Sequence, residues 1–199
     1  MLSNKAIIRV FAVLLISFVA GCASSPEKIS ASHVVTIEKE REATSDYEAT
    51  VSLWNSYEDV ANWLKANYSF DRDRQQEVLR QIRQQGPAGV ILQSPAETFR
   101  LKKGYCKDAA KFTIDALNRI NPKYNARFVF VRNKVGPPHH WVTGFTMKSK
   151  LFVMDFGAGP KWQAMNGVHG PYRTLSEYVE FLSSLHIKRF VPESADWRH

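Results

Sequence analysis

The apolar residues change their spacing partway along this chain of 199 residues, and this change constrains the fold more than any other feature. Between residues 51 and 121 they recur at helical intervals. Between residues 126 and 156 they form short runs rich in Val, Phe, Trp and Thr, which are typical of strands. Helices that precede the strands, instead of alternating with them, predict an α+β fold.

Capping and turn signals divide these two regions into elements. Ser94 and Thr174 are each followed three residues later by Glu, which is the capping box of a helix start. The region from residue 157 to residue 171 holds four Gly and two Pro, so we expect a long loop there. The predicted helices cover residues 51–68, 71–85, 94–104, 105–121 and 174–185, and the predicted strands cover residues 126–131, 140–147, 151–156 and 187–191.

The N-terminus has the pattern of a secretory leader. Lys5 and Arg9 precede an apolar run that extends from residue 10 to residue 20, which is too short to cross a bilayer comfortably. Val19-Ala20-Gly21-Cys22 resembles the bacterial lipobox, in which the cysteine is lipidated and becomes the mature N-terminus. We therefore predict a lipid on Cys22, with an ordinary signal peptide cut nearby as the alternative. By analogy with Gram-negative lipoproteins, Ala23 in place of Asp favours the outer membrane, facing the periplasm.

The predicted organisation has three parts: a signal peptide at 1–21, the lipidated Cys22 with a flexible tether at 22–50, and one folded domain at 51–199. Residues 23–50 are rich in Ser, Ala, Thr and Glu and poor in large apolar groups, which suits a tether. The 44% of hydrophobic residues suffices for a globular core in the remainder.

Charge limits the classes of partner. Cleavage before Cys22 removes Lys5 and Arg9 and no acid, which lowers the formal charge from +8 to +6. The basic residues form no stripe interleaved with aromatics, and a secreted protein does not meet nucleic acid, so we expect none as a partner. The expected partners are the membrane, through the lipid on Cys22, and a peptide or protein of the cell envelope.

Cys106 is the only cysteine left in the predicted domain. Gly104-Tyr105 lets the chain turn, so Cys106 falls in the first turn of the next helix. The unpaired amides and the dipole of a helix start favour a thiolate, which is the nucleophilic form of cysteine. The alternative is a buried structural cysteine, because Cys106 also belongs to the apolar stripe of that helix.

A catalytic thiol needs an imidazole to share its proton and a group to orient that imidazole. A hairpin turning at Lys148-Ser149 would make His140 a diagonal neighbour of Asp155 on one face of the sheet, within reach of a hydrogen bond. His139 would then point to the other face, although a three-residue turn would reverse this choice. The alternatives are a surface role for His140 and a loop-capping role for Asp155.

The residues resemble the transglutaminase-like superfamily, with the bacterial transglutaminase-like cysteine proteinases as the closest group. Gly104-Tyr105-Cys106-Lys107-Asp108 is similar to the family's G-x-C-x-D helix start. The strand segments that begin at His140 and end at Asp155 are similar to its histidine and aspartate strands, with separations of 34 and 15 residues. The resemblance covers residues 94–156. It implies a papain-like α+β core, in which the cysteine helix packs on an antiparallel sheet that carries the histidine and the aspartate.

The resemblance implies a thiol hydrolase that cleaves peptide or amide bonds through Cys106, His140 and Asp155. Some bacterial relatives bind calcium with acids on both sides of the cysteine, but Tyr105 and Lys107 stand there in this chain. We therefore expect no metal and no cofactor. Lys107 could instead help to hold a thiolate, and Asp108 would cap its own helix.

Two other functions stay open at this point. One is acyl transfer to an amine, which passes through the same thioester as hydrolysis. The other is a non-catalytic module that binds an envelope protein or polysaccharide. His139, Trp141, Trp162 and His169 are further candidates for the lining of a cleft.

Overall fold

A computed structural model describes residues 31–199 of the chain. The predicted signal peptide at 1–21 and the predicted lipidation site Cys22 lie outside the described residues. Within residues 31–199, no helix combines the length and the apolar character that a membrane span requires.

The N-terminal half of the described chain is helical, as the spacing of its apolar residues predicts. A two-stranded parallel sheet joins the segments that precede α3 and α5, through the pairs Ser69–Lys103 and Phe70–Gly104. The elements are α1 (Ala31–Val51), α2 (Tyr57–Asn67), β1 (Ser69–Phe70), α3 (Arg72–Gln85), η1 (Pro87–Gly89), α4 (Pro95–Leu101), β2 (Lys103–Gly104) and α5 (Cys106–Ile120).

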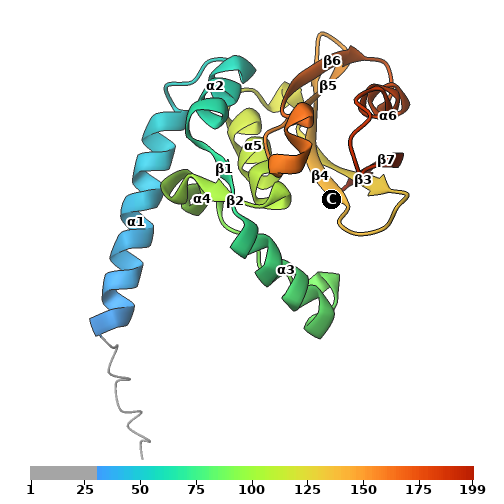
Figure 1. Ribbon diagram of the computed structural model, residues 1–199. Coiled ribbons are helices and arrows are strands. Elements are labelled where there is room, and N and C mark those ends of the chain that lie inside the picture. Colours follow the sequence, from blue (N-terminus) through green and yellow to red (C-terminus); the bar gives the residue numbers. More distant parts are fainter. Residues whose placement is uncertain (1–30) are drawn as a thin grey trace, which may run out of the picture.

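The C-terminal half forms an antiparallel sheet of five strands in the order β6-β5-β4-β3-β7, which confirms the α+β fold. The elements are η2 (Pro122–Tyr124), β3 (Arg127–Asn133), β4 (His140–Met147), β5 (Lys150–Asp155), η3 (Pro160–Met165), β6 (Gly167–Tyr172), α6 (Leu175–Ser184) and β7 (Pro192–Arg198). Figure 1 shows α5 between the other N-terminal helices and this sheet, with α6 on the far side of the sheet.

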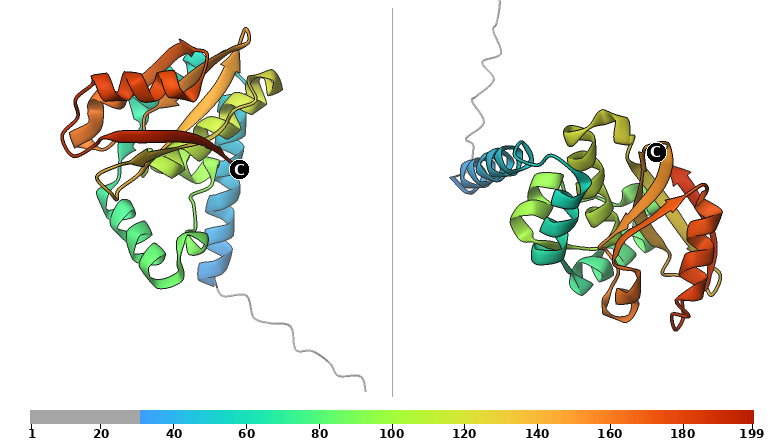
Figure 2. Two further views of the ribbon diagram at one scale, coloured as in Figure 1. Left: turned by 90° about the vertical axis from the view of Figure 1, so that its right-hand side faces the viewer. Right: turned by 90° about the horizontal axis from the view of Figure 1, so that it is seen from above.

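The two faces of the sheet bury different apolar clusters. On one face, Phe112 of α5 belongs to a buried cluster with Phe145 and Met154 of the sheet. On the other face, Tyr178 of α6 is buried with residues such as Val129. Figure 2 shows the same layers from two further directions. The cysteine helix therefore packs on the antiparallel sheet.

The predicted flexible tether at 22–50 is wrong for residues 31–50, which belong to α1. Ala43, Tyr47 and Val51 recur every four residues and are all buried. The Tyr47 hydroxyl donates a hydrogen bond of 2.7 Å to Asp115 of α5, and its ring lies 5.6 Å from the ring of Phe112. Three buried positions in a polar helix give only a weak sequence signal, and they become decisive when α5 and α4 cover them.

The two C-terminal predictions also need correction. The predicted loop at 157–171 contains η3 and the edge strand β6, because an edge position tolerates the Gly and Pro that discouraged a strand prediction. The predicted strand at 187–191 is wrong. Those residues form a turn that buries Phe190 and holds Arg189 at a φ of 62°, and the strand that pairs with β3 begins at Pro192.

Candidate active site

Cys106 is the first residue of α5 and lies at the wall of an open cavity. Cys106 is 6% exposed and is among the residues that line a cavity of about 880 Å³. The prediction of a cysteine at a helix start is confirmed. The thiol is therefore largely shielded by protein but is not sealed in the apolar interior.

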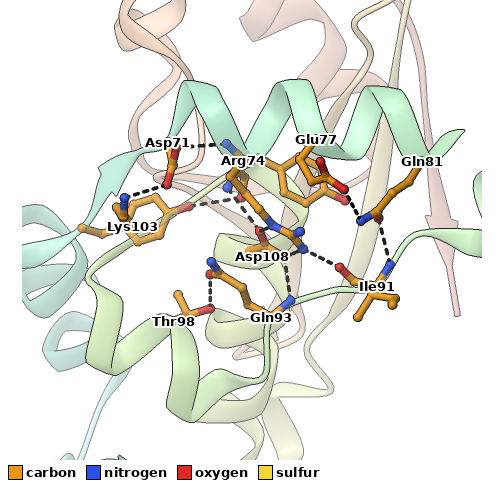
Figure 3. A network of polar contacts seen from close by, with 11 residues as sticks. Asp71, Arg74, Glu77, Gln81, Ile91, Gln93, Thr98, Lys103 and Asp108 are labelled. Atoms are coloured by element: carbon orange, nitrogen blue, oxygen red, sulfur yellow. Dashed lines mark hydrogen bonds and ion pairs between the residues drawn. The ribbon is translucent and has the colours of Figure 1, made fainter. Parts of the chain in front are cut away.

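Asp108 fixes the start of α5. One of its carboxylate oxygens accepts a hydrogen bond from the backbone amide of Tyr105 at 3.3 Å, and the other accepts one from the backbone amide of Gln93 at 3.0 Å. Arg74 of α3 donates to the same carboxylate from Nε at 3.0 Å (Figure 3). The predicted capping role is confirmed, and the same side chain also ties α3 and the segment before α4 to the cysteine helix.

Gly104 serves this site through its lack of a side chain. We expected it to let the chain turn, but it lies in β2 and is not among the residues with a positive φ. A Cβ at this position would lie 2.9 Å from the Gln93 side chain and 3.0 Å from the Tyr68 hydroxyl. Glycine is therefore required because these buried groups approach the backbone closely.

His140 and Asp155 are joined by a short hydrogen bond. The pairs Thr143–Met154 and Met147–Lys150 set the register of the hairpin, and Lys148 and Ser149 turn with positive φ values of 49° and 59°.

The hairpin therefore has the two-residue turn that the diagonal placement of His140 and Asp155 requires. His140 Nε2 lies 2.6 Å from Asp155 Oδ2, and the two side chains are 1% and 0% exposed. Both residues lie at the end of the sheet where β4 begins and β5 ends.

The second oxygen of Asp155 holds the loop beyond β5. Asp155 Oδ1 accepts a hydrogen bond of 3.1 Å from the Gly157 amide. Asp155 therefore makes both of the contacts considered from the sequence: one oxygen bonds the His140 ring, and the other caps the loop. Gly157 in turn lies against Cys106, because a Cβ there would be 2.5 Å from the Cys106 Cα. The sequence signalled Gly157 only as part of a glycine-rich loop.

Cys106 also acts on the His140 imidazole, as a hydrogen-bond partner and as a charge, and both effects raise the pKa of His140. Because Asp155 occupies Nε2, Nδ1 is the ring nitrogen left for Cys106. Burial alone would lower the pKa of His140. The charge and hydrogen bond of Asp155, followed by the contact with Cys106, outweigh burial and raise the pKa to about 10. The structure thus brings Cys106, His140 and Asp155 into one chain of contacts.

The sequence also matches a known family at the same residues. Residues 41–163 match the family described as a transglutaminase-like domain. The chain belongs to this family. No curated protein matches the chain. The matched residues begin inside α1 and include Cys106, His140 and Asp155.

Aromatic rings enclose the histidine of this transglutaminase-like domain. The centroid of the Trp162 ring lies 5.9 Å from that of the His140 imidazole, and the centroid of the Phe190 ring lies 6.4 Å from it. Both pairs have edge-to-face geometry. Trp162 lines the cavity, as predicted. These rings keep water from the imidazole, which strengthens its electrostatic interaction with Asp155.

The remaining candidates have structural contacts. The His139 ring belongs to the cavity lining, but its Nδ1 accepts a hydrogen bond of 3.1 Å from the Asn133 amide. His169 bonds the Met165 carbonyl with its Nε2 at 2.6 Å. The Lys107 ammonium lies 4.2 Å from the centroid of the Trp141 ring, which therefore packs under the cation instead of lining the cavity.

The transglutaminase-like domain shows no candidate metal centre in its described part. Among residues 31–199, no three His, Cys, Asp or Glu side chains gather closely enough to hold an ion. Three residues that shape the site escaped the sequence analysis, because each acts through a partner far along the chain: Arg74, Gln93 and Asn133.

Proposed function

We propose that the protein is a cysteine hydrolase that cleaves peptide or amide bonds through a triad of Cys106, His140 and Asp155. The observation that carries this proposal is the continuous contact from thiol to imidazole to carboxylate at the wall of an open cavity. Membership of the transglutaminase-like family supports it, because acyl chemistry at a cysteine is common to this superfamily.

The first half-reaction forms an acyl-enzyme. The Cys106 thiol gives its proton to His140, and the thiolate attacks the carbonyl carbon of the substrate. The tetrahedral intermediate collapses as the C–N bond breaks, and the imidazolium donates its proton to the leaving amine. The raised pKa of His140, about 10, supports this role because it favours the protonated ring at neutral pH.

The second half-reaction releases the acid. His140 takes a proton from a water molecule, whose oxygen attacks the thioester carbon. The C–S bond then breaks, and the sulfur recovers a proton from the imidazolium. If an amine takes the place of water, the same steps transfer the acyl group. Hydrolysis and acyl transfer thus differ only in which nucleophile reaches the thioester.

Two backbone features prepare the site for these steps. The amide of Cys106 is the first of α5, so its N–H has no acceptor within the helix and can stabilise an oxyanion. The Gly157 amide holds Asp155, which in turn holds the imidazole by Nε2 and leaves Nδ1 for the thiol. The ring orientation is therefore set before substrate binds.

The proposed location is the periplasmic side of the outer membrane, with a lipid on Cys22. The basic leader and Val19-Ala20-Gly21-Cys22 support it. Cells expressing the full chain should incorporate labelled palmitate into the wild-type protein and not into Cys22→Ser. Labelling of both proteins, or of neither, would remove the anchor from the proposal.

A thiol-directed probe tests the proposed nucleophile. We expect folded protein to be labelled near pH 7, with labelling lost in Cys106→Ala and retained in Cys22→Ser, which is the matched control. Peptide hydrolysis should show the same dependence. Hydrolysis that survives Cys106→Ala would refute the mechanism. Incorporation of a labelled amine into the acyl product, in place of water, would reassign the protein to acyl transfer.

A further inference from the structure

The cavity beside Cys106 has a lining of one charge sign. Among the described residues, its lining contains four cationic side chains and no Asp or Glu: Arg72, Lys161, Lys188 and Arg189. They come from three segments that are distant in the sequence, namely α3, η3 and the turn after α6. The fold therefore collects cations around the sulfur from both walls of the cavity.

These four side chains are exposed and carry no ion pair with a carboxylate of residues 31–199. Another cation in this part of the fold does have a carboxylate partner, since Arg132 Nε lies 3.9 Å from Glu193 Oε2. Like charges gathered at one cavity repel one another, and an anionic ligand relieves that repulsion.

One cationic wall is held in place by Asn133, whose residue is only 3% exposed. Its Nδ2 donates hydrogen bonds to the Arg189 carbonyl at 3.1 Å and to the Pro138 carbonyl at 3.4 Å. Its Oδ1 accepts one from the Val191 amide at 3.0 Å. A buried side chain thus ties the turn that carries Lys188 and Arg189 to the loop before His140.

The opposite wall is held by α3. Arg72, Gln75 and Gln76 line the cavity from this helix. Arg74, on the same helix, bonds Asp108 and the Ile91 carbonyl (Figure 3). The contact that fixes the start of α5 therefore also fixes where Arg72 stands relative to Cys106.

We infer that the substrate is an acidic peptide, with Asp or Glu side chains flanking the reacting amide. This inference rests on the proposed function and adds the substrate class to it. Carboxylates accept charge-assisted hydrogen bonds from Arg and Lys. The amides of Gln75 and Gln76 can bond a peptide backbone, and Phe70 and Trp162 add apolar surface. Cations in a cleft also raise the rate at which an anionic substrate arrives.

Three peptides of equal length and identical central sequence test the inference, with Glu, Gln or Lys at the flanking positions. We expect kcat/KM to decrease in the order Glu, Gln, Lys. The advantage of Glu over Gln should be about tenfold at low salt and should shrink at 0.5 M salt, because salt screens exposed charges. Equal rates for Glu and Gln, or a preference for Lys, would overturn the inference.

A pair of charge-matched variants locates the effect. Lys188→Gln/Arg189→Gln removes two cations from the cavity wall, and Lys65→Gln/Lys123→Gln removes two exposed cations that do not line it. We expect the Glu-over-Gln preference to fall about fivefold in the first variant, because exposed ion pairs contribute about 0.2–1 kcal/mol each. It should not change in the control. An equal loss in both variants would contradict the assigned site.

Binding separates this inference from the proposed function. Fluorescent Glu and Gln peptides are titrated into full-length Cys106→Ala and followed by anisotropy. Tighter binding of the Glu peptide supports an acidic substrate even if hydrolysis proves independent of Cys106, which would refute only the proposed mechanism. Equal binding of both peptides refutes the inference and leaves the mechanism intact. If the protein bound a carboxylated polysaccharide and neither peptide, that result would also refute the inference of an acidic peptide substrate.

Discussion

Two buried carboxylates, Asp108 and Asp155, serve the same cysteine in different ways. Both side chains are 0% exposed, and each forms an ion pair with a nitrogen base. Asp108 pairs with Arg74 at 3.0 Å, and Asp155 pairs with His140 at 2.6 Å. In burial and in carboxylate chemistry the two residues are nearly equivalent, so their partners must distinguish their roles.

The partner decides whether a proton can move. A guanidinium stays protonated at every pH at which the protein is folded, so the pair of Asp108 can hold geometry but cannot exchange protons. An imidazole binds and releases a proton near neutral pH, and Asp155 biases that equilibrium. Asp108 also accepts hydrogen bonds from the Tyr105 and Gln93 amides, which joins three segments of the fold. We therefore propose that Asp108 serves stability and that Asp155 serves the proposed chemistry.

The same substitution at both positions tests this assignment, and Asp155→Asn should have the larger effect on activity. The amide can donate to His140 Nε2 and favour the wrong tautomer. We expect kcat/KM for a peptide substrate to fall by about 10³-fold or more. The free energy of unfolding should also fall, but by less than it does in Asp108→Asn, because the buried imidazole can become neutral whereas the Arg74 guanidinium cannot.

Steady-state kinetics and urea unfolding of the same preparation measure these two effects. The assignment of Asp155 to chemistry requires that the rate loss exceeds any loss of folded protein. A variant that keeps wild-type kcat/KM, or one that is inactive only because it is unfolded, would remove the distinction between the two carboxylates.

Asp108→Asn should produce the reverse pattern. It leaves the Arg74 guanidinium largely buried without its counter-charge, and breaking a buried pair in this way costs about 3 kcal/mol of unfolding free energy. The folded fraction should retain kcat/KM within about fivefold, since the amide oxygen can still accept from a backbone N–H of the α5 start. Urea unfolding and active-site titration of folded protein provide the measurement. A normal stability with a large loss of kcat would give Asp108 a part in catalysis.

The third expected effect is a pH dependence of stability. The pKa of His140 is about 10 in the folded protein, against an ordinary value of 6.5. Because the folded value is higher, the bond to Asp155 contributes its full stabilisation below pH 6.5 and loses it as the pH rises through 10. The unfolding free energy of the wild type, minus that of His140→Gln, should therefore decrease between pH 6 and pH 10.

Urea unfolding at several pH values under reducing conditions gives this difference directly. The destabilisation by Asp108→Asn is the control, and it should stay constant over the same range because Arg74 does not titrate there. A wild-type advantage over His140→Gln that is constant or rises with pH would show that the imidazole is not held protonated.

Much of the fold could be predicted because it depends on local patterns. Apolar spacing located α2, α3 and α5, and a capping box located the start of α4. Helix α1 was missed because Tyr47 and its neighbours become core residues only when α5 packs on them. Strands β6 and β7 were missed because both are edge strands of the sheet, whose sequences need not be apolar.

The site divides in the same way. Cys106, His140 and Asp155 could be chosen from a helix start and a hairpin register, both of which involve neighbouring stretches of chain. Arg74 could not be chosen, because its partner Asp108 lies 34 residues away on another helix. Asn133 was missed for the same reason, since it bonds the Arg189 carbonyl 56 residues away.

By itself, the sequence determined the helical segments from α2 to α6, how one hairpin is registered and which three side chains are the candidates for catalysis. These properties follow from interactions within a few residues or across one tight turn. Only the tertiary structure decided that the sulfur lies at an open cavity, that this cavity is lined by cations and that two buried carboxylates have different partners. Exposure and charge environment depend on which distant segments pack together, and the local apolar pattern of a segment does not specify its packing partners.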